Sequence, residues 1–171
     1  MHTVADQLVG SVPRFDQVMA DHLPMIRRIA AAHESNVTTR QDLVQDILCA
    51  VWRALPNFRD EGGLRAFIAR IAANRAVTHV QRALRLPDST ELTCDIAASE
   101  PDPEAHAIAV SEKGRLLAAL RALPIGLRVP ALLVLEGFSQ QEIASVLGIS
   151  PNAVAIRMTR AKSGLRKLIG K

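Results

Sequence analysis

The stretch EGFSQQEIASVLGISPNAVAIRMTRAKSGLRKLIGK, residues 136–171, decides the fold of its half of the chain because it marks the ends of two helices. Ser139 is a typical N-cap, and Gln141-Glu142 supplies a side chain that reaches back from the third helical position. Phe138 and Ile143 flank this cap at the spacing of a hydrophobic staple. The pattern predicts a helix that starts at Ser139.

A second helix follows after a tight turn. Gly148 stands just past the first helix, where a left-handed backbone is needed. Ser150-Pro151 then gives a second N-cap, with proline in the first helical turn. Ala144 and Val154 provide a small residue at the helix contact and an apolar anchor in the second helix. The stretch therefore predicts a helix-turn-helix.

The second of these helices carries charge of one sign. Residues 151–171 contain six basic residues and no acid: Arg157, Arg160, Lys162, Arg166, Lys167 and Lys171. Duplex DNA is the natural counter-charge for such a segment. The alternative is a solvated basic helix at the end of a small helical domain, but that reading leaves the coincidence of the three turn signals and the charge run unexplained.

Composition limits the class of protein. The chain has 171 residues, 49% of them hydrophobic, and a formal net charge of +4. This predicts a mostly helical protein with one or two modest cores. The longest apolar run is only Ala131 to Leu135, so we expect neither a signal peptide nor a membrane span. Cys49 and Cys94 are far apart and lack metal-ligand spacing, which favours a reduced, cytoplasmic location and no metal or other cofactor.

An acidic segment divides the chain. Residues 86–112 contain no Lys or Arg, include prolines at 87, 101 and 103, and hold seven acids: Asp88, Glu91, Asp95, Glu100, Asp102, Glu104 and Glu112. We expect a flexible acidic linker over 87–105 between two small all-α domains, 1–86 and 106–171. The simpler explanation of its acidic residues is that they keep the linker solvated. The alternative is that they repel the linker from DNA.

The first half contains two further helical patterns. From Asp42 to Leu55, apolar residues form two neighbouring stripes at helical spacing, one of which includes Trp52, so most of this helix should be core. Thr38 and Thr39 are candidate N-caps. The remaining polar face is narrow and consists of Asp42, Gln45, Asp46, Cys49 and Arg53.

The next helix is expected over residues 64–85. Ala73, Val77, Val80 and Leu84 should share its apolar face, opposite Asn74, Arg75, Thr78, Arg82 and Arg85. Residues 65–85 hold five arginines and no acid. Such a face can touch phosphates and base edges, although a solvated surface helix would have a similar sequence.

In this order, the motifs resemble a small two-domain sigma factor of the extracytoplasmic-function group. Asp42 to Ile47, Trp52 to Leu55, Phe58-Arg59, and Leu64 to Asn74 match that family's region two. The region-four motifs are Leu123-Pro124, Glu136 to Ser139, Glu142 to Ala144 and Leu147 to Ser150. The resemblance runs from about Phe15 to Leu168 and omits only the linker.

The resemblance implies partners and roles. Core RNA polymerase would bind through its beta-prime clamp helices and its beta subunit, and the beta-prime contacts would involve Asp42, Leu43, Gln45 and Asp46. The minus-ten element would be opened and read as a single strand by residues in and before the helix expected over residues 64–85: Phe58, Arg59, Arg65, Asn74, Arg75, Thr78 and Arg82. The basic C-terminal helix would enter the major groove of the minus-thirty-five element. Its candidate residues are Ser150, Asn152, Ala153, Ile156, Arg157, Arg160 and Lys162. An anti-sigma factor is a possible further partner.

Some positions depart from the family pattern. The family commonly has Thr-Val-Lys-Ser-Arg-Leu in the DNA-reading helix, whereas residues 153–158 are Ala-Val-Ala-Ile-Arg-Met, so two usual polar contacts are missing. Ile156 could meet a thymine methyl group or pack internally. Pro130 falls where the family's preceding helix continues, and because a proline inside a helix costs about 3 kcal/mol or more, we expect that helix to begin near it.

Two other classes of function are weighed. A stand-alone helix-turn-helix regulator with an N-terminal dimerisation domain would explain the second half but not residues 42–47. An enzyme is disfavoured because the five histidines are scattered and no phosphate-binding glycine loop is present. The sequence does not reveal the promoter, the activating signal or the redox state of either cysteine.

Overall fold

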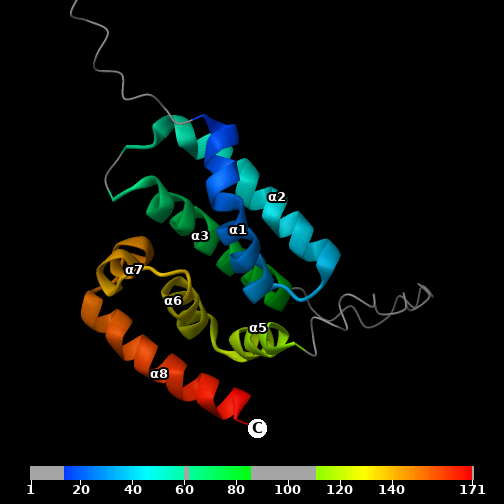
Figure 1. Cartoon of the computed structure of the whole chain (residues 1–171), viewed down its shortest axis with the longest axis vertical. Coiled ribbons are helices and arrows are strands. Elements are labelled where there is room, and N and C mark those ends of the chain that lie inside the picture. The colour runs from blue at the N-terminus through cyan, green and yellow to red at the C-terminus, as the bar shows by residue number, and fades with distance from the viewer. Residues whose placement is uncertain (1–13, 60–61, 86–110, 171) are drawn as a thin grey trace, which may run out of the picture.

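The computed structural model describes residues 14–59, 62–85 and 111–170, and these residues form helices joined by short connections, without strands (Figure 1). The all-α prediction is therefore confirmed. The first unit contains α1 (Phe15–His33), α2 (Val37–Ala54), the short 3-10 helix η1 (Leu55–Asn57) and α3 (Leu64–Arg85). The second unit contains α5 (Glu112–Ala122), α6 (Ile125–Leu135), α7 (Gln140–Leu147) and α8 (Pro151–Ile169). The expected linker 87–105 and Cys94 lie outside the described residues.

The first unit packs through a core of isoleucines and alanines. Ile26, Ile29, Ile47 and Ile68 are fully buried. Between them α3 presents its small residues Ala69, Ala72, Ala73 and Ala76. Alanine carries little side chain, so α3 approaches its neighbours closely and the packing of three helices fixes its position.

The buried face of α3 differs in part from the expected one, since Ala73 is buried as predicted but the other three residues are not. Val77 and Val80 are only half-buried, and Leu84 is 80% exposed. The burial follows Ile68, Ala69, Ala72 and Ala76 instead, because residues 81–85 extend into solvent in the described part of the chain. Apolar periodicity alone does not show how far along a helix other helices pack against it.

Two expectations about α2 are also wrong. Its N-cap is Asn36, whose side chain accepts a hydrogen bond from the Thr39 backbone at 3.0 Å, so Thr38 and Thr39 lie within the first turn. Trp52 is 61% exposed rather than buried. Leu43, Ile47, Ala50 and Val51 already fill the buried face, and Trp52 projects from another side of the helix.

The second unit follows its local sequence signals. Ser139 caps α7, its hydroxyl accepts the Glu142 backbone N–H, and the Glu142 carboxylate accepts the Ser139 N–H at 2.7 Å. Gly148 then takes the left-handed conformation with φ 64°. Ser150 caps α8 through the Ala153 N–H at 3.1 Å. The predicted helix-turn-helix is confirmed in each of these details.

Pro130 does not start α6 as expected. The helix begins at Ile125, and Pro130 lies inside it. Proline removes one intrahelical hydrogen bond, but Pro130 is among the most deeply buried residues. The sequence shows only the local cost of a proline inside a helix. The expectation failed because burial of Pro130 against neighbouring helices offsets that cost.

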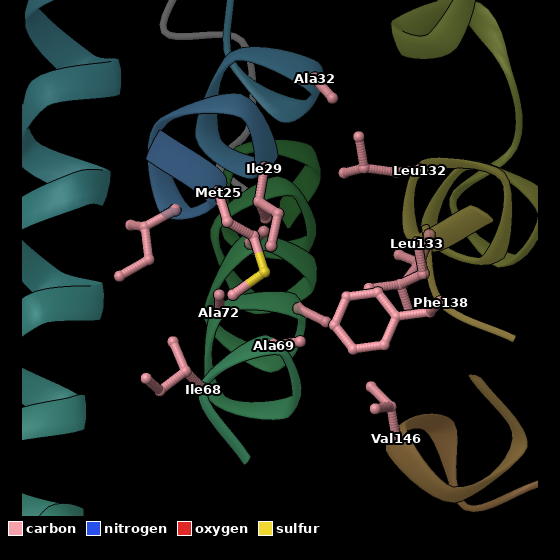
Figure 2. Packing of buried hydrophobic residues seen from close by; sticks show 14 of the residues in the cluster. Met25, Ile29, Ala32, Ile68, Ala69, Ala72, Leu132, Leu133, Phe138 and Val146 are labelled. Atoms are coloured by element: carbon pink, nitrogen blue, oxygen red, sulfur yellow. The ribbon is translucent and has the colours of Figure 1, made fainter. Parts of the chain in front are cut away.

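The two units pack directly on one another. Figure 2 shows Ile29 and Ala32 of α1 and Ala69 of α3 on the side of the second unit, with Met25 of α1 and Ala72 of α3 packed beside them. The residues opposite them are Leu132 and Leu133 of α6, Phe138 before α7, and Val146 of α7 (Figure 2). The apolar seam makes one continuous core across the two halves.

Candidate functional sites

A polar strip runs along the exposed side of α2. Asp42, Gln45 and Asp46 are all exposed, so their side chains are available to a partner. Leu43 is only 3% exposed and supports the strip from the core, because it lies on the buried face of the helix. Trp52 extends the strip by two turns and was missed as a surface residue, since its apolar character suggested the core. Large aromatic residues often anchor protein interfaces.

A basic cleft of about 700 Å³ borders this strip. Asp42 and Gln45 line one side, and Lys113 and Leu117 of α5 contribute to the wall from the second unit. The remaining charged lining residues are all basic: Arg27, Arg28 and Arg40. The second unit thus lies beside the predicted polymerase-docking residues. The sequence alone did not indicate this arrangement.

A smaller hollow of about 180 Å³ separates α2 from α3. Asp42 and Asp46 face Arg75, Thr78 and Arg82 across it. The Arg75 guanidinium lies 3.7 Å from the Asp46 carboxylate, and both side chains are partly exposed. The structure therefore brings residues predicted to dock polymerase next to residues predicted to contact DNA.

The other predicted minus-ten residues lie at the opposite end of α3. Phe58 packs against Phe67 with ring centroids 5.1 Å apart, and Arg59 is exposed beside it. Arg65, in the first turn, is about 15 Å along the helix from Arg75. The candidates thus form two groups rather than one continuous surface, and the exposed Asn74 belongs to the group that contains Arg75.

Arg65 is exposed, and it also contacts the second unit. Its guanidinium donates to the Glu136 carbonyl oxygen and lies 4.3 Å from the centre of the Phe138 ring. Both contacts belong to the second unit. Such a cation over an aromatic face is stabilised by the ring quadrupole.

The N-terminal part of α8 presents an exposed face. Asn152, Ile156 and Arg160 are exposed one turn apart, and Ile156 is 47% exposed, so it projects outward rather than packing internally. Arg157 and Ala153 are half-buried at the side of this face, and Lys162 is exposed. Ser150 uses its hydroxyl for the cap.

Thr159 is a further member of this face that sequence reasoning missed. It is exposed between Ile156 and Arg160, and its hydroxyl donates to the Ala155 carbonyl oxygen at 3.1 Å. Its position one turn after Ile156 is the signal that could have identified it. The face can therefore offer a methyl group, amide and hydroxyl groups and a guanidinium to a groove.

Two buried basic side chains, His33 of α1 and Arg128 of α6, influence one another electrostatically where α1 contacts the second unit. His33 is 6% exposed, and burial lowers its pKa to about 4, while Arg128 of α6 opposes its protonation. The His33 Nδ1 lies 2.8 Å from the Ile29 carbonyl oxygen. Arg128 donates to the Leu123 carbonyl oxygen at 3.0 Å, and burial lowers its pKa. Neutral His33 avoids a second buried charge at this contact.

Comparison with known proteins places these surfaces in a family. Residues 18–85 match the model of Sigma-70 region 2, and residues 113–165 match Sigma-70, region 4. The RNA polymerase sigma factor CnrH of Cupriavidus metallidurans is 32% identical over 94% of this chain and 88% of its own length. The ECF RNA polymerase sigma factor ShbA of Streptomyces griseus is 34% identical over 75% of this chain and 70% of its own.

A solved structure agrees with this assignment. The sigma factor RpoE of Bartonella quintana, in complex with the anti-sigma factor NepR, matches with a TM-score of 0.71 and 25% identity over 91% of this chain and 96% of that one. The fold and its surfaces define a two-part, helical promoter-recognition protein. The chain belongs to the extracytoplasmic-function sigma factors of the sigma-70 family.

Family membership settles the class of function. The protein is an RNA polymerase sigma factor that directs core polymerase to promoters and initiates transcription. The match to region 2 removes the alternative of a stand-alone regulator whose first half only dimerises. Sigma factors are non-catalytic initiation factors. None of the helices in the described ranges is long and apolar enough to cross a membrane.

Proposed function

We propose that this sigma factor uses three separate surfaces, one for polymerase and two for promoter DNA. Core polymerase binds the exposed strip of α2, with Asp42, Gln45 and Asp46 as polar contacts. Trp52 adds an apolar anchor at its far end. Its 61% exposure supports this role, because an exposed tryptophan is costly to leave in water and can be buried by a partner.

The minus-thirty-five element is read by the exposed face of α8. Asn152, Thr159 and Arg160 provide hydrogen-bonding groups, and Ile156 is placed to contact a thymine methyl group. The basic residues farther along the helix contact phosphates. The observation that carries this proposal is the coincidence of an accessible polar face and a segment without acids on the second helix of a capped helix-turn-helix.

The minus-ten element is opened by the two groups of residues on and before α3. Arg59 and Arg65 act at one end, and Asn74, Arg75, Thr78 and Arg82 act at the other. The packed rings of Phe58 and Phe67 form an apolar contact between the residues before α3 and the start of α3. Contacts that only an unstacked strand can make shift the equilibrium toward melting.

We also propose that an anti-sigma factor regulates the protein and that it acts in the cytoplasm, where polymerase and chromosome meet. RpoE of Bartonella quintana is solved with the anti-sigma factor NepR, and this chain shares its fold over 91% of its length. The basic cleft beside α2 would suit an acidic partner segment. Co-purification from cells would identify such a partner.

Run-off transcription tests the assignment directly. Purified core polymerase and this protein should produce defined transcripts from fragmented genomic DNA, and their start sites give the promoter sequence. The double variant Asp42→Arg/Asp46→Arg should lower core affinity at least tenfold, because two favourable charges become repulsive. The matched control is Asp16→Arg/Asp21→Arg, which reverses two exposed charges on α1. Equal core affinity for both folded variants would refute the docking strip.

A further inference from the structure

We propose that Gln140 is a positioning residue for promoter reading, because its side chain holds the first turn of α8 in the orientation that α8 needs in the major groove. This inference rests on the proposed role of α8 at the minus-thirty-five element. It adds a residue of α7, the other helix of the motif, to those that determine specificity, and it assigns Gln140 no contact with DNA.

A hydrogen bond joins the first residues of the two helices of the motif. Gln140 begins α7 and Pro151 begins α8. The Gln140 Nε2 donates to the Pro151 carbonyl oxygen at 2.7 Å, across 11 positions of sequence. Within the described ranges, no other side-chain hydrogen bond runs from α7 to α8. The start of the DNA-reading helix is therefore tied to α7 through this one amide group.

Both ends of this bond lie in well-defined first turns. On α7, Ser139 and Glu142 cap each other's backbone N–H groups, and Ile143 is fully buried. On α8, the Ser150 hydroxyl accepts the N–H of the third helical residue at 3.1 Å. Gln140 therefore connects two turns whose backbones are already ordered, so its hydrogen bond acts on their relative position.

The apolar contacts of α8 begin only after its first residues. Val154 and Ala161 are its fully buried side chains, about two turns apart on one line of the helix. Farther along, a Cβ added at Gly164 would lie 2.7 Å from the Leu123 side chain, so that part of α8 packs closely against the residues between α5 and α6. Pro151, by contrast, is exposed. The Gln140 bond supplies a contact at the end of the helix that lacks apolar packing.

Contacts along one line fix the distance of a helix from its neighbours better than its rotation about its own axis. Helical spacing places Asn152 and Ile156 on the side of α8 opposite Val154, and both are exposed. With side chains, a helix has a radius of about 5–6 Å, so a rotation of about 10° moves its surface groups by about 1 Å. Recognition groups must be held to within about 0.5 Å or 10–20°. A bond that resists this rotation therefore acts on base reading without touching a base.

Gln141 offers a comparison within the same turn. It has the same side chain as Gln140 and is also exposed, but its amide makes no hydrogen bond in the described part of the chain. Changes at Gln141 therefore reproduce the loss of a glutamine and any added charge. The difference between the two positions isolates the contact with Pro151.

The pair Gln140→Glu and Gln141→Glu tests the proposal in holoenzyme assembled with core polymerase. Each variant adds one carboxylate to the first turn of α7, where the helix dipole favours negative charge. Only Gln140→Glu replaces the donor to Pro151 with an acceptor. Binding is measured on the promoter found by run-off transcription, with its minus-ten element unchanged and its minus-thirty-five element either cognate or scrambled. The ratio of the two affinities measures base discrimination.

Gln140→Glu should lower this ratio about threefold to tenfold, the range expected for one hydrogen bond. Gln141→Glu should keep the wild-type ratio, although its charge weakens binding to both duplexes. Gln140→Lys retains a donor and should keep the ratio of its charge control, Gln141→Lys. Thermal melts establish that each variant is folded, and Gln140→Ala against Gln141→Ala replaces the first pair if a carboxylate prevents folding.

Equal ratios for the folded Gln140 and Gln141 variants of the glutamate pair, or of the alanine pair that replaces it, would overturn the positioning role. An equal loss of discrimination in Gln140→Lys and Gln140→Glu would also overturn it, since the donor would then have no effect. Wild type separates these results from failure of the proposed function. If wild-type holoenzyme binds cognate and scrambled elements equally, α8 does not read this element; if it discriminates and the Gln140 variants do so equally well, only the positioning role fails.

Discussion

The two helical units of this sigma factor are specified in different ways. In the second unit, α7 and α8 begin at serine caps and α7 ends at a left-handed glycine, so short-range hydrogen bonds define each boundary. In the first unit, α1 lacks a side-chain cap bond at Arg14, and α3 presents mainly small residues to its neighbours. The comparison shows that short-range hydrogen bonds set the ends of α7 and α8, whereas the positions of α1 and α3 depend on packing between helices.

The same contrast extends to the functional surfaces. On α8, the predicted residues Asn152, Ile156 and Arg160 are exposed as helical spacing indicates, although Arg157 is half-buried and Thr159 was missed. In the first unit Arg65 contacts the second unit and Arg75 pairs with Asp46. Surfaces assembled from several helices are therefore harder to infer, and their accessibility depends on how the two units sit together.

The largest expected effect comes from the core of the locally specified unit. Ile143→Ala should destabilise the protein by about 2–5 kcal/mol, because Ile143 is fully buried and its truncation leaves a cavity. Ile156→Ala, the matched change on the exposed face of α8, should change stability by less than about 0.5 kcal/mol. Urea denaturation measures both. Similar losses for the two variants would show that Ile156 also belongs to the core.

A pH effect tests the contact between the units. Burial lowers the pKa of His33 to about 4 from an ordinary value of 6.5, and Arg128 and His79 face it from α6 and α3. The unfolded chain therefore binds this proton more readily, so stability is lost as pH falls from 6.5 toward 4. The loss due to His33 should reach about 2 kcal/mol at pH 5.

The control for this effect is His33→Gln. The variant lacks the titrating ring, so its unfolding free energy should depend less on pH between 4 and 6.5 than that of wild type. Denaturation at several pH values gives both curves. Parallel curves would show that His33 does not cause the acid sensitivity.

A smaller effect distinguishes base reading from phosphate contact along α8. Arg157→Ala should cost about 1–3 kcal/mol on the preferred minus-thirty-five element and little on other sequences, the size of one good base contact. Arg166→Ala should weaken binding to all sequences and reduce the magnitude of the salt slope by about 0.9 if one phosphate contact is lost. Binding to cognate and scrambled duplexes over a salt series separates the two.

The half-buried position of Arg157 makes this test informative. If its removal weakens cognate and scrambled binding equally, Arg157 is a phosphate contact. Base reading would then fall to the exposed side chains of Asn152, Ile156 and Arg160, with Thr159 beside them.

The smallest effect concerns the helix caps. Ser139→Ala removes the hydroxyl that accepts the Glu142 N–H and should cost about 1 kcal/mol. Asn36→Ala removes the cap of α2 and should cost a similar amount, although that helix also packs through Leu43, Ile47 and Val51. Melting temperatures of both variants make the comparison. A negligible loss for Ser139→Ala would mean that packing, not capping, positions α7.

The helices that carry the candidate site could be predicted from the sequence, but the exposure of their side chains could be predicted only in part. The helix over residues 64–85 and the helix-turn-helix follow from periodicity and turn signals. Trp52 and Leu84 were expected in apolar stripes and are exposed. Hydrophobicity shows that a residue can be buried, whereas burial requires a neighbour at that point on the helix.

The sequence by itself determined the helices, the capped turn, the one-signed charge of α8 and the family motifs, because each depends on residues within a few positions of one another. Only the tertiary structure decided that Pro130 lies inside α6, that Arg28 and Glu136 meet across 108 positions, and that Arg65 contacts the second unit. These features depend on the packing of distant helices, whose free energy is shared among many weak contacts and leaves no local pattern in the chain.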